Sequence, residues 1–317
     1  MTRPDRASAF APASVGNAAV GFDLLGFAVA GAGDTVHAVR SDQPAVVIDE
    51  IRGTVTDLPL EPDKNTAGRA VQSLLEAVRA DFGVRLRIDK GIPLGSGLGG
   101  SAASATAALV AVNALLPEPL SVAELYPHAL AGEAIASGSP HGDNVGPQLL
   151  GGLVLAAPDH LFRLPLPEGL SAVVVHPDHI VETRLAREVL QTGFGIAEIV
   201  AQQTRLGLFL SGCYQKDLEL IRAGLADDLI EPRRAQLIPG FSAVKQAALD
   251  QGALGASISG AGPSVFGWFT SVDAAQIAAD NMITAFRDNG LEATALISGL
   301  DAPGAHLIEA SEATCAT

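Results

Sequence analysis

Alternating and β-branched apolar runs predict strands in the first third of the chain and again after residue 150. Residues 84–88 alternate strictly between apolar and arginine positions, and residues 36–40 and 45–49 carry repeated valines and an isoleucine. Period-two alternation places successive side chains on opposite faces of a sheet, so these three segments predict one sheet. Two later apolar runs, 152–157 and 170–176, predict strands on either side of a turn rich in proline and aspartate.

Segments with a helical period separate these strands. Apolar residues recur every three or four positions within 65–82, which predicts an amphipathic helix. Residues 101–116 are nearly all apolar, so a second helix there is expected to be buried. A third helix, 121–137, begins with Ser121 and Glu124 in the spacing of a capping box.

The second half of the chain predicts a lobe of its own. Its pattern is helical over 182–229 and 239–248, then strand, turn and strand over 256–268, a helix over 272–289 and a strand over 292–298. This order of elements is typical of an α+β lobe. We therefore expect two lobes, residues 1–165 and 166–317.

Composition narrows the class of protein. A chain of 317 residues with 48% hydrophobic residues can bury a large core. The net charge of −15 argues against a nucleic-acid or anionic-membrane partner, since both would require a basic face. Two cysteines, Cys213 and Cys315, make neither a disulfide framework nor a zinc site, which favours a reducing, cytoplasmic setting. Residues 1–23 lack the pattern of a secretory signal, and no apolar run is long enough to span a bilayer.

The most specific chemical signal is the segment PLGSGLGGSAAS, residues 93–104, which holds four glycines and three serines directly before the apolar helix. Glycine permits positive φ and close approach, so successive N–H groups can point at one anion, and the helix dipole adds to their attraction. This pattern predicts a phosphate-binding loop. The Walker pattern G-x-x-x-x-G-K-S/T needs a lysine, and none occurs between Lys90 and Lys216. Backbone dipoles and a metal must then neutralise the phosphate charge.

The loop also satisfies the dinucleotide pattern G-x-G-x-x-G at residues 95–100, but no acidic residue follows about 20 positions on. Two other segments place polar side chains close together. Asn17 and Asp23 flank Gly21, a pair suited to an ammonium group, although an ordinary strand with an Asx turn is the alternative.

In residues 139–152, three polar side chains fall within four positions after the third predicted helix: His141, Asp143 and Asn144. Such a cluster could provide a general base or a ligand clamp. For His141 alone, a loop residue hydrogen-bonded to backbone is the alternative.

These segments resemble the motifs of the GHMP kinases. Residues 93–102 are similar to the phosphate loop P-x-x-x-G-L-G-S-S-A of that family, with Gly100 in place of the first serine and Ser101 as the second. Residues 11–26 are similar to A-P-A-S/T-x-x-N-x-x-x-G-F-D-x-L-G, with Ala19-Val20 where some members carry Gly-Pro. The resemblance continues through H-x-D-N-V-x-P at 141–147, a third motif at 259–266 and the segment 299–309, so it spans nearly the full length in the family's order.

The resemblance implies a two-lobed α+β fold, with an N-terminal lobe of the ribosomal-protein-S5-like type and a C-terminal ferredoxin-like α/β lobe. The motif forms are those of the members that act on L-homoserine. They imply ATP-dependent phosphorylation of its side-chain hydroxyl, on the route to threonine, with Mg²⁺ as cofactor. No nucleic-acid or membrane partner is expected, and a homodimer is compatible with the resemblance.

The resemblance also assigns the site. It places ATP on Pro93, Leu94, Gly95, Ser96, Gly97, Leu98, Gly99, Gly100, Ser101, Ala102 and Ala103, with Asn65 at the adenine because it precedes a predicted helix. It places Mg²⁺ on Ser101 and Glu133, although a lone glutamate on a helix is more often solvated. Homoserine would contact Asn17, Asp23, His141, Arg187, Arg234 and Gly260, with Thr183 near the reacting hydroxyl.

Two points of chemistry stay open in this assignment. A guanidinium offers paired donors to a carboxylate, but Arg184 and Arg233 lie beside the assigned Arg187 and Arg234. Asn144 cannot take a proton, which favours stabilisation by metal and backbone in a loose transition state, with Asp23 or Asp143 as the alternative base.

Two rival functions follow from the same residues. The first is another GHMP kinase for a small alcohol such as mevalonate, against which the Asn17 and Asp23 pair argues. The second is a regulator of GHMP fold that binds ligand without catalysis, and the presence of both Ser101 and Glu133 argues against it.

Overall fold

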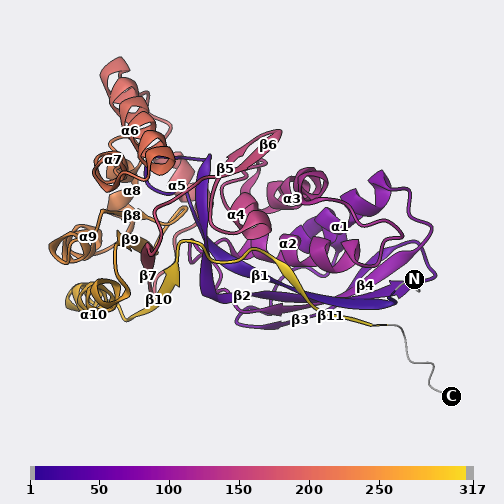
Figure 1. Ribbon diagram of the computed structural model, residues 1–317. Helices are drawn as coiled ribbons and strands as arrows, with labels where there is room; N and C mark the ends of the chain where they lie inside the picture. Colours follow the sequence, from indigo (N-terminus) through magenta and orange to yellow (C-terminus); the bar gives the residue numbers. More distant parts are fainter. Residues whose placement is uncertain (1–3, 312–317) are drawn as a thin grey trace.

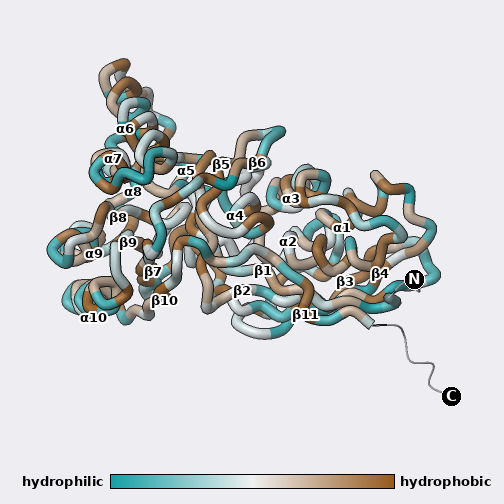
Figure 2. The backbone as a smooth tube through the Cα atoms, viewed as in Figure 1, coloured by the Kyte–Doolittle hydropathy of each residue, from teal (hydrophilic) through white to brown (hydrophobic). Residues whose placement is uncertain are grey.

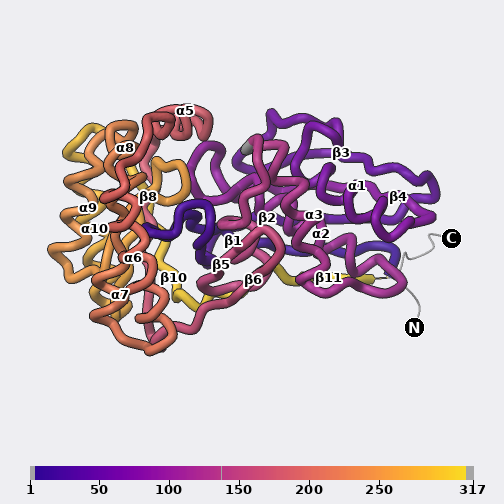
Figure 3. The backbone as a smooth tube through the Cα atoms, turned by 90° about the horizontal axis from the view of Figure 1, so that it is seen from above, coloured from indigo at the N-terminus to yellow at the C-terminus, as the bar shows by residue number. Residues whose placement is uncertain are grey.

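A computed structural model describes residues 4–311 of the 317-residue chain, so Cys315 lies outside the described residues. Two sheets, each covered by helices, form two lobes that lie side by side (Figures 1 and 3). The predicted two-lobed α+β class is confirmed. No helix within residues 4–311 is long and apolar enough to cross a membrane.

The first sheet has the strand order β11-β1-β2-β4-β3, with β5 paired to β2 and β6 to β5. Its strands are β1 (Arg6–Gly16), β2 (Leu25–Ser41), β3 (Val46–Gly53), β4 (Gly83–Lys90), β5 (Leu153–Ala157), β6 (His160–Arg163) and β11 (His306–Ser311). The helices of this lobe are α1 (Thr66–Ala77), α2 (Gly100–Asn113), α3 (Val122–Ser137) and α4 (Val145–Leu150), with a 3-10 turn, η1 (Pro62–Lys64). Figure 1 shows these helices on one side of the sheet.

The second sheet is antiparallel throughout, in the order β10-β7-β9-β8. Its strands are β7 (Ser171–Pro177), β8 (Gly255–Ile258), β9 (Val265–Phe269) and β10 (Ala293–Gly299). The helices are α5 (Thr183–Glu188), α6 (Ile196–Gln215), α7 (Leu218–Gly224), α8 (Glu231–Arg234), α9 (Phe241–Asp250) and α10 (Val272–Asp288), with η2 (Ala235–Leu237). Figure 2 shows hydrophilic and hydrophobic residues alternating along α10, whose buried face is Ala275, Ala278, Ala279, Met282 and Phe286.

The helix patterns explain how the lobes are packed. Helix α2 is buried nearly all round, as its apolar sequence predicts, because α1 and α3 cover the side turned away from the sheet. Where the lobes meet, Trp268 lies with its ring 5.5 Å from Phe27 of the first sheet and 5.7 Å from Phe209 of α6. All three rings are fully buried, so a shared apolar core joins the lobes.

Three features differ from the sequence expectations. The predicted turn around 158–167 contains a strand, β6, and the predicted helical stretch 182–229 is broken between α5 and α6, where Gly193 and Gly195 weaken the helix. The final strand, β11, pairs antiparallel with β1 in the first sheet. The expected boundary at residue 165 lies in the connection between β6 and β7. One strand within the expected second lobe, β11, belongs to the first sheet.

Candidate active site

The glycine-rich loop connects β4 to α2 and is held in a conformation that glycine favours. Gly95, Gly97 and Gly99 have φ of 65°, 76° and 69°. Gly99 is the residue that precedes α2, and no side chain caps the helix there. The first N–H groups of α2 are thus available to an anion, and the helix dipole favours its negative charge.

A buried ion pair between Lys90 and Asp34 supports this loop, and the sequence analysis did not predict it. Lys90 forms an ion pair with Asp34, and its Nζ also donates to the carbonyl of Gly100 at 2.7 Å and to Ser104 Oγ at 2.8 Å. Asp34 also accepts from the backbone N–H of Ile92 at 3.3 Å. All polar groups find partners, as a buried charge requires. The only signal in the sequence was a lone lysine just before the loop.

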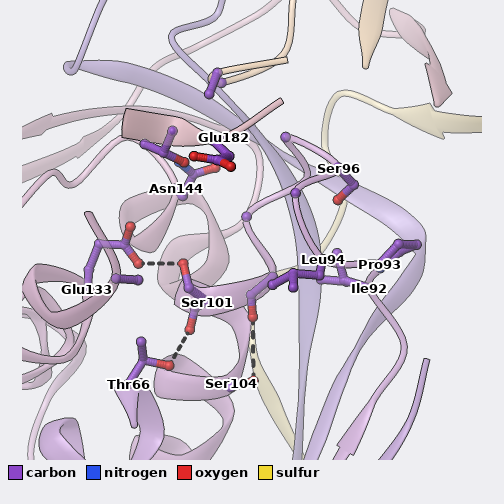
Figure 4. A pocket seen from close by; sticks show the side chains of 18 of the residues that line it. Thr66, Ile92, Pro93, Leu94, Ser96, Ser101, Ser104, Glu133, Asn144 and Glu182 are labelled. Atoms are coloured by element: carbon purple, nitrogen blue, oxygen red, sulfur yellow. Dashed lines mark hydrogen bonds between the residues drawn. The ribbon is translucent and has the colours of Figure 1, made fainter. Parts of the chain in front are cut away.

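Ser101, in the first turn of α2, lies next to Glu133 of α3. Ser101 Oγ donates to Glu133 Oε2 at 2.9 Å, and Thr66 Oγ1 donates to the carbonyl of Ser101 at 2.9 Å (Figure 4). Burial raises the pKa of Glu133 to about 8; the hydrogen bond from Ser101 acts in the opposite direction, and the charge of Asp143 raises it further. A cation at this position would remove the cost of ionising Glu133.

The donor set fits Mg²⁺. One hydroxyl and one carboxylate are hard oxygen ligands, and Mg²⁺ usually takes one or two carboxylates and completes its shell with phosphate oxygens and water. Within the described part of the chain, no cluster of three or more His, Cys, Asp or Glu side chains could hold a metal ion. The ion would therefore depend on a bound phosphate for part of its coordination.

The turn after β1 holds Asn17 in a network of three hydrogen bonds. Its backbone N–H donates to Asp143 Oδ2 at 2.9 Å, its Nδ2 donates to the carbonyl of Gly260 at 2.7 Å, and its Oδ1 accepts from the N–H of Asp23 at 3.0 Å. Asn17, Ala18, Ala19 and Asp23 all have positive φ, between 34° and 69°. Such conformations cost roughly 1–3 kcal/mol each and are typical of functional sites.

Asp23 pairs with Arg187, which reaches it from α5 in the other lobe. The two guanidinium nitrogens of Arg187 lie 3.2 and 3.0 Å from the carboxylate oxygens of Asp23. His141 Nδ1 lies 3.4 Å from Asp23 Oδ2, and burial lowers the pKa of His141 while the charge of Asp23 raises it. From the sequence, Asp23 was expected to bind an ammonium group and Arg187 a carboxylate. In the structure these two side chains pair with each other.

Arg234, at the end of α8, is only 3% exposed. Its Nε donates to the carbonyl of Ala186 at 3.0 Å and its Nη1 to the carbonyl of Gly260 at 2.9 Å. Burial lowers the pKa of Arg234 to about 10, and the charge of Arg187 acts in the same direction, so it remains cationic at neutral pH.

Of the two neighbouring arginines, Arg184 is exposed at the cavity rim and paired with Glu188 at 2.5 Å. Arg233 stacks on Phe194 and donates to the carbonyl of Thr192 at 2.8 Å. Neither arginine contacts Asp23 or the carbonyl of Gly260, which are the partners of Arg187 and Arg234.

Asp143 and Asn144 lie between α3 and α4, and Asn144 is the residue directly before α4. Asp143 is 4% exposed, and burial raises its pKa to about 6, with the charge of Asp23 adding to the shift. The hydrogen bond from the N–H of Asn17 opposes this shift. A carboxyl group with a pKa near neutrality can exchange a proton with a substrate at physiological pH.

One cavity of about 530 Å³ joins these groups. The predicted site residues that line it are Asn17, Asp23, Asn65, Pro93, Leu94, Gly95, Ser96, Gly97, Gly99, Gly100, Ser101, Glu133, His141, Asp143, Asn144, Thr183, Arg187, Arg234 and Gly260. Leu98, Ala102 and Ala103 do not line it: they are at most 3% exposed and pack in the core behind the loop.

The cavity has two halves. We call the loop 93–100 with Ser101 and Glu133 the nucleotide half, and the groups around Asp23, Arg187 and Arg234 the acceptor half. Beyond the loop, the nucleotide half continues into an apolar wall formed by Ile51, Val55, Leu58, Pro59, Ile88, Ile92 and Ile135. Asn65 lies there, but it caps α1 through its Oδ1 and donates to the carbonyl of Pro59 at 2.9 Å, so most of its side chain is already engaged.

Comparisons with known proteins identify the family. Residues 65–152 match the model for the N-terminal domain of the GHMP kinases, and residues 209–288 match the model for their C-terminal domain. A homoserine kinase from Xanthomonas campestris pv. campestris is 56% identical over 95% of this chain and 94% of its own length. The chain belongs to the GHMP kinase family.

Within that family, the similarity is to homoserine kinases over nearly the whole chain. A homoserine kinase from Xylella fastidiosa is 54% identical over 96% of this chain and 94% of its own length. The crystal structure of homoserine kinase from Cytophaga hutchinsonii superposes with a TM-score of 0.93 at 40% identity, covering 97% of this chain and 99% of that one. The mevalonate kinase of L. major, at 15% identity and a TM-score of 0.67, shares the fold.

Proposed function

We propose that this chain is an ATP-dependent homoserine kinase, which transfers the γ-phosphoryl group of ATP to the side-chain hydroxyl of L-homoserine and forms O-phospho-L-homoserine. The observation that carries the proposal is the acceptor half of the cavity. It presents one carboxylate, Asp23, and two guanidinium groups, Arg187 and Arg234, beside a phosphate loop. A small amino acid with a free hydroxyl complements both charges.

The zwitterion would exchange with the ion pair between Asp23 and Arg187. When homoserine binds, its ammonium group takes Asp23 and Asn17 Oδ1 as partners, and its carboxylate takes Arg187 and Arg234. Asp23 exchanges one cationic partner for another, and Arg187 exchanges one carboxylate for another. No buried charge is therefore left without a partner of opposite sign. Thr183, the first residue of α5, also lines the cavity, and we place the substrate hydroxyl beside it.

The loop N–H groups and the start of α2 hold the phosphates of ATP. Ser101 and Glu133 would hold Mg²⁺, which, when bound, neutralises part of the phosphate charge during transfer. Lys90 contributes through the carbonyl of Gly100, where it fixes the first residue of α2.

We propose Asp143 as the group that takes the hydroxyl proton. Both oxygens of Asp23 are held by Arg187, whereas Asp143 has a pKa of about 6 and accepts one hydrogen bond from the N–H of Asn17. A loose transition state needs the proton only late, so Asn144 contributes by orientation rather than by proton transfer. A role in threonine biosynthesis, a cytoplasmic location and a homodimer belong to the same proposal.

The rival substrate, mevalonate, carries a carboxylate but no ammonium group, so it would leave Asp23 without its cation. A non-catalytic regulator would not need Ser101 and Glu133 as magnesium ligands beside the loop. The geometry thus favours the homoserine kinase over both rivals.

The test is an assay of ADP release with Mg·ATP and L-homoserine, mevalonate, galactose or no acceptor. Turnover with L-homoserine alone is expected. Two further acceptors remove one charge each: 4-hydroxybutyrate lacks the ammonium group, and 3-aminopropanol lacks the carboxylate. Each should lower kcat/KM by about a hundredfold, since a charged hydrogen bond contributes about 1.5–3 kcal/mol. Equal turnover with mevalonate would contradict the assignment of Asp23, and no turnover with any acceptor would favour the regulator.

A further inference from the structure

A buried chain of hydrogen bonds connects the phosphate loop to Asn144. Gln148 Nε2, on α4, donates to the carbonyl of Gly99 at 2.9 Å and to Ser14 Oγ at 3.0 Å. Ser14 Oγ in turn donates to Asn144 Oδ1 at 2.9 Å. Ser14 and Gln148 are both 0% exposed, and neither was assigned a role by the motifs.

The direction of every bond in this chain follows from its first acceptor. A backbone carbonyl can only accept, so Gln148 must turn its amide nitrogen toward Gly99. The second N–H of that nitrogen goes to Ser14, which then spends its single proton on Asn144. The oxygen of the Asn144 amide therefore faces Ser14. Its nitrogen is left without a partner in this chain of hydrogen bonds, on a residue that lines the cavity.

The opposite orientation of Asn144 is unfavourable. With its nitrogen toward Ser14, the hydroxyl of Ser14 would have no acceptor among the residues that the structure describes, and a buried unsatisfied hydroxyl costs about 1–3 kcal/mol. Although an asparagine amide is easily assigned either way round, this network decides between the two orientations.

Steric contacts hold the same groups in place. A Cβ on Gly99 would lie 2.8 Å from both Asn144 Oδ1 and Gln148 Nε2, so only glycine fits there. The backbone N–H of Ser14 donates to the carbonyl of Leu98 at 3.1 Å. The loop, Ser14 and Asn144 are thus connected to one another, and Gln148 is the buried residue that links them.

We propose that Ser14 and Gln148 are positioning residues that fix Asn144 as a hydrogen-bond donor toward the reacting oxygens and couple that orientation to the phosphate loop. The proposal rests on the proposed function, since Asn144 lines the cavity beside the loop. No described residue accepts a hydrogen bond from Asn144 Nδ2, so this N–H₂ group is free for a phosphoryl or hydroxyl oxygen.

The first test compares kcat with KM. Ser14→Ala and Gln148→Met should each lower kcat about tenfold to a hundredfold, because a misplaced catalytic group costs on that order, while both KM values change little. Ser14→Thr keeps the hydroxyl and should restore most of kcat. The double variant should lose no more than the worse single variant, because both break one chain. Ser298→Ala, which removes a buried hydroxyl, 4% exposed, from a residue that does not line the cavity, should leave kcat unchanged. Multiplicative losses in the double variant would overturn the proposal.

The second test asks whether Asn144 donates or accepts. Asn144→Asp replaces the nitrogen by an oxygen, so under the proposal it should lose as much kcat as Asn144→Ala, about a hundredfold or more. A kcat for Asn144→Asp near that of the unaltered protein would show that an acceptor is needed there and would overturn the proposal.

The third test does not depend on the acceptor substrate. In ¹⁵N-labelled protein, the side-chain amide protons of Gln148, identified by their loss in Gln148→Met, should exchange slowly with solvent, and Ser14→Ala should speed the exchange of one of them. Exchange as fast as that of the exposed Gln246 would refute the hydrogen-bonded chain, whatever the enzyme phosphorylates.

Discussion

The two halves of the cavity hold their ligands by different means. The nucleotide half offers backbone N–H groups in a conformation set by three glycines, and Glu133 is the acidic side chain that lies beside them. The acceptor half offers charged side chains, Asp23, Arg187 and Arg234, that already pair with one another or with carbonyls.

This difference separates the effects that single substitutions can have. Backbone donors are insensitive to a change of side chain unless the change alters the path of the chain. Charged side chains in a partly buried pocket carry their function individually, and each can be removed alone. Substitutions in the acceptor half should therefore act on KM for the acceptor substrate. Substitutions in the nucleotide half should act on the binding of ATP and on the geometry of phosphoryl transfer.

The largest effect is expected from Glu133→Ala, which removes the carboxyl group proposed as a metal ligand. We expect kcat to fall on the order of a thousandfold, because the metal would lose its carboxylate ligand. The free energy of unfolding should change little, because without a cation burial keeps Glu133 mostly protonated at neutral pH and no ion pair is lost. Steady-state kinetics and thermal unfolding measure both quantities, with Glu76→Ala as a surface control. A kcat near that of the unaltered protein would refute the metal role.

Arg234→Ala tests the acceptor half. Loss of one charged hydrogen-bonding group should raise KM for L-homoserine about tenfold to a hundredfold, with KM for ATP little changed. The neighbouring Arg233→Ala provides a matched control, because Arg233 stacks on Phe194 outside the cavity. If both arginine variants raise KM for homoserine equally, the carboxylate site is misplaced.

Asp143→Asn should lower kcat, because it removes the proposed base, and should raise the free energy of unfolding at neutral pH. Because burial raises the pKa of Asp143 from 3.8 to about 6, the folded state holds this proton more tightly than the unfolded state. The free energy of unfolding therefore falls as the pH rises through this window, by up to about 3 kcal/mol at 1.36 kcal/mol per pKa unit. The variant should be more stable than the unaltered protein above pH 6 and equally stable below pH 4.

Denaturant unfolding at pH 4 and pH 7 measures this difference, and Asp250→Asn is an exposed control. A variant that is less stable at pH 7 would show that Asp143 is kept for structure rather than for reaction.

The smallest effect is expected from Gly97→Ala in the loop. At φ of 76°, an alanine is strained by about 1–2 kcal/mol, and its Cβ would meet the carbonyl of Ser259 at 2.5 Å. We expect KM for ATP to rise about tenfold, because a strain of about 1–2 kcal/mol corresponds to about 5-fold to 30-fold in affinity, while KM for homoserine is little affected. Gly193→Ala is the control, because no atom lies within 4 Å of its added Cβ. An unchanged KM for ATP would contradict a phosphate-binding role of this backbone.

The sequence predicted more of the nucleotide half than of its supports. A run of glycines before an apolar helix is a local signal, and the loop and α2 occur where it placed them. The ion pair of Lys90 with Asp34 joins strands 56 residues apart, and the chain from Ser14 to Gln148 spans 134 residues. No local pattern records such contacts, because they arise only when the sheet and helices come together.

The acceptor half shows a different limit. Resemblance located Asp23 and Arg187, but their direct pairing depends on how α5 approaches the turn after β1. The positive φ of Ala18 and Ala19 is likewise imposed by the surrounding contacts, since alanine alone disfavours it. Leu98, Ala102 and Ala103 belong to the loop motif, yet they serve the core, since a motif does not distinguish residues that bind from residues that pack.

The pairing of β11 with β1 has a consequence for how the chain can be rearranged. Arg6 lies directly opposite Ser311 across these two strands, so the two ends of the described chain meet at the edge of one sheet (Figure 1). A short linker could join them, and new ends could be opened at the exposed turn between β5 and β6, far along the sequence from both. Such a circular permutant would keep every strand neighbour of the native sheet except the covalent link across that one turn.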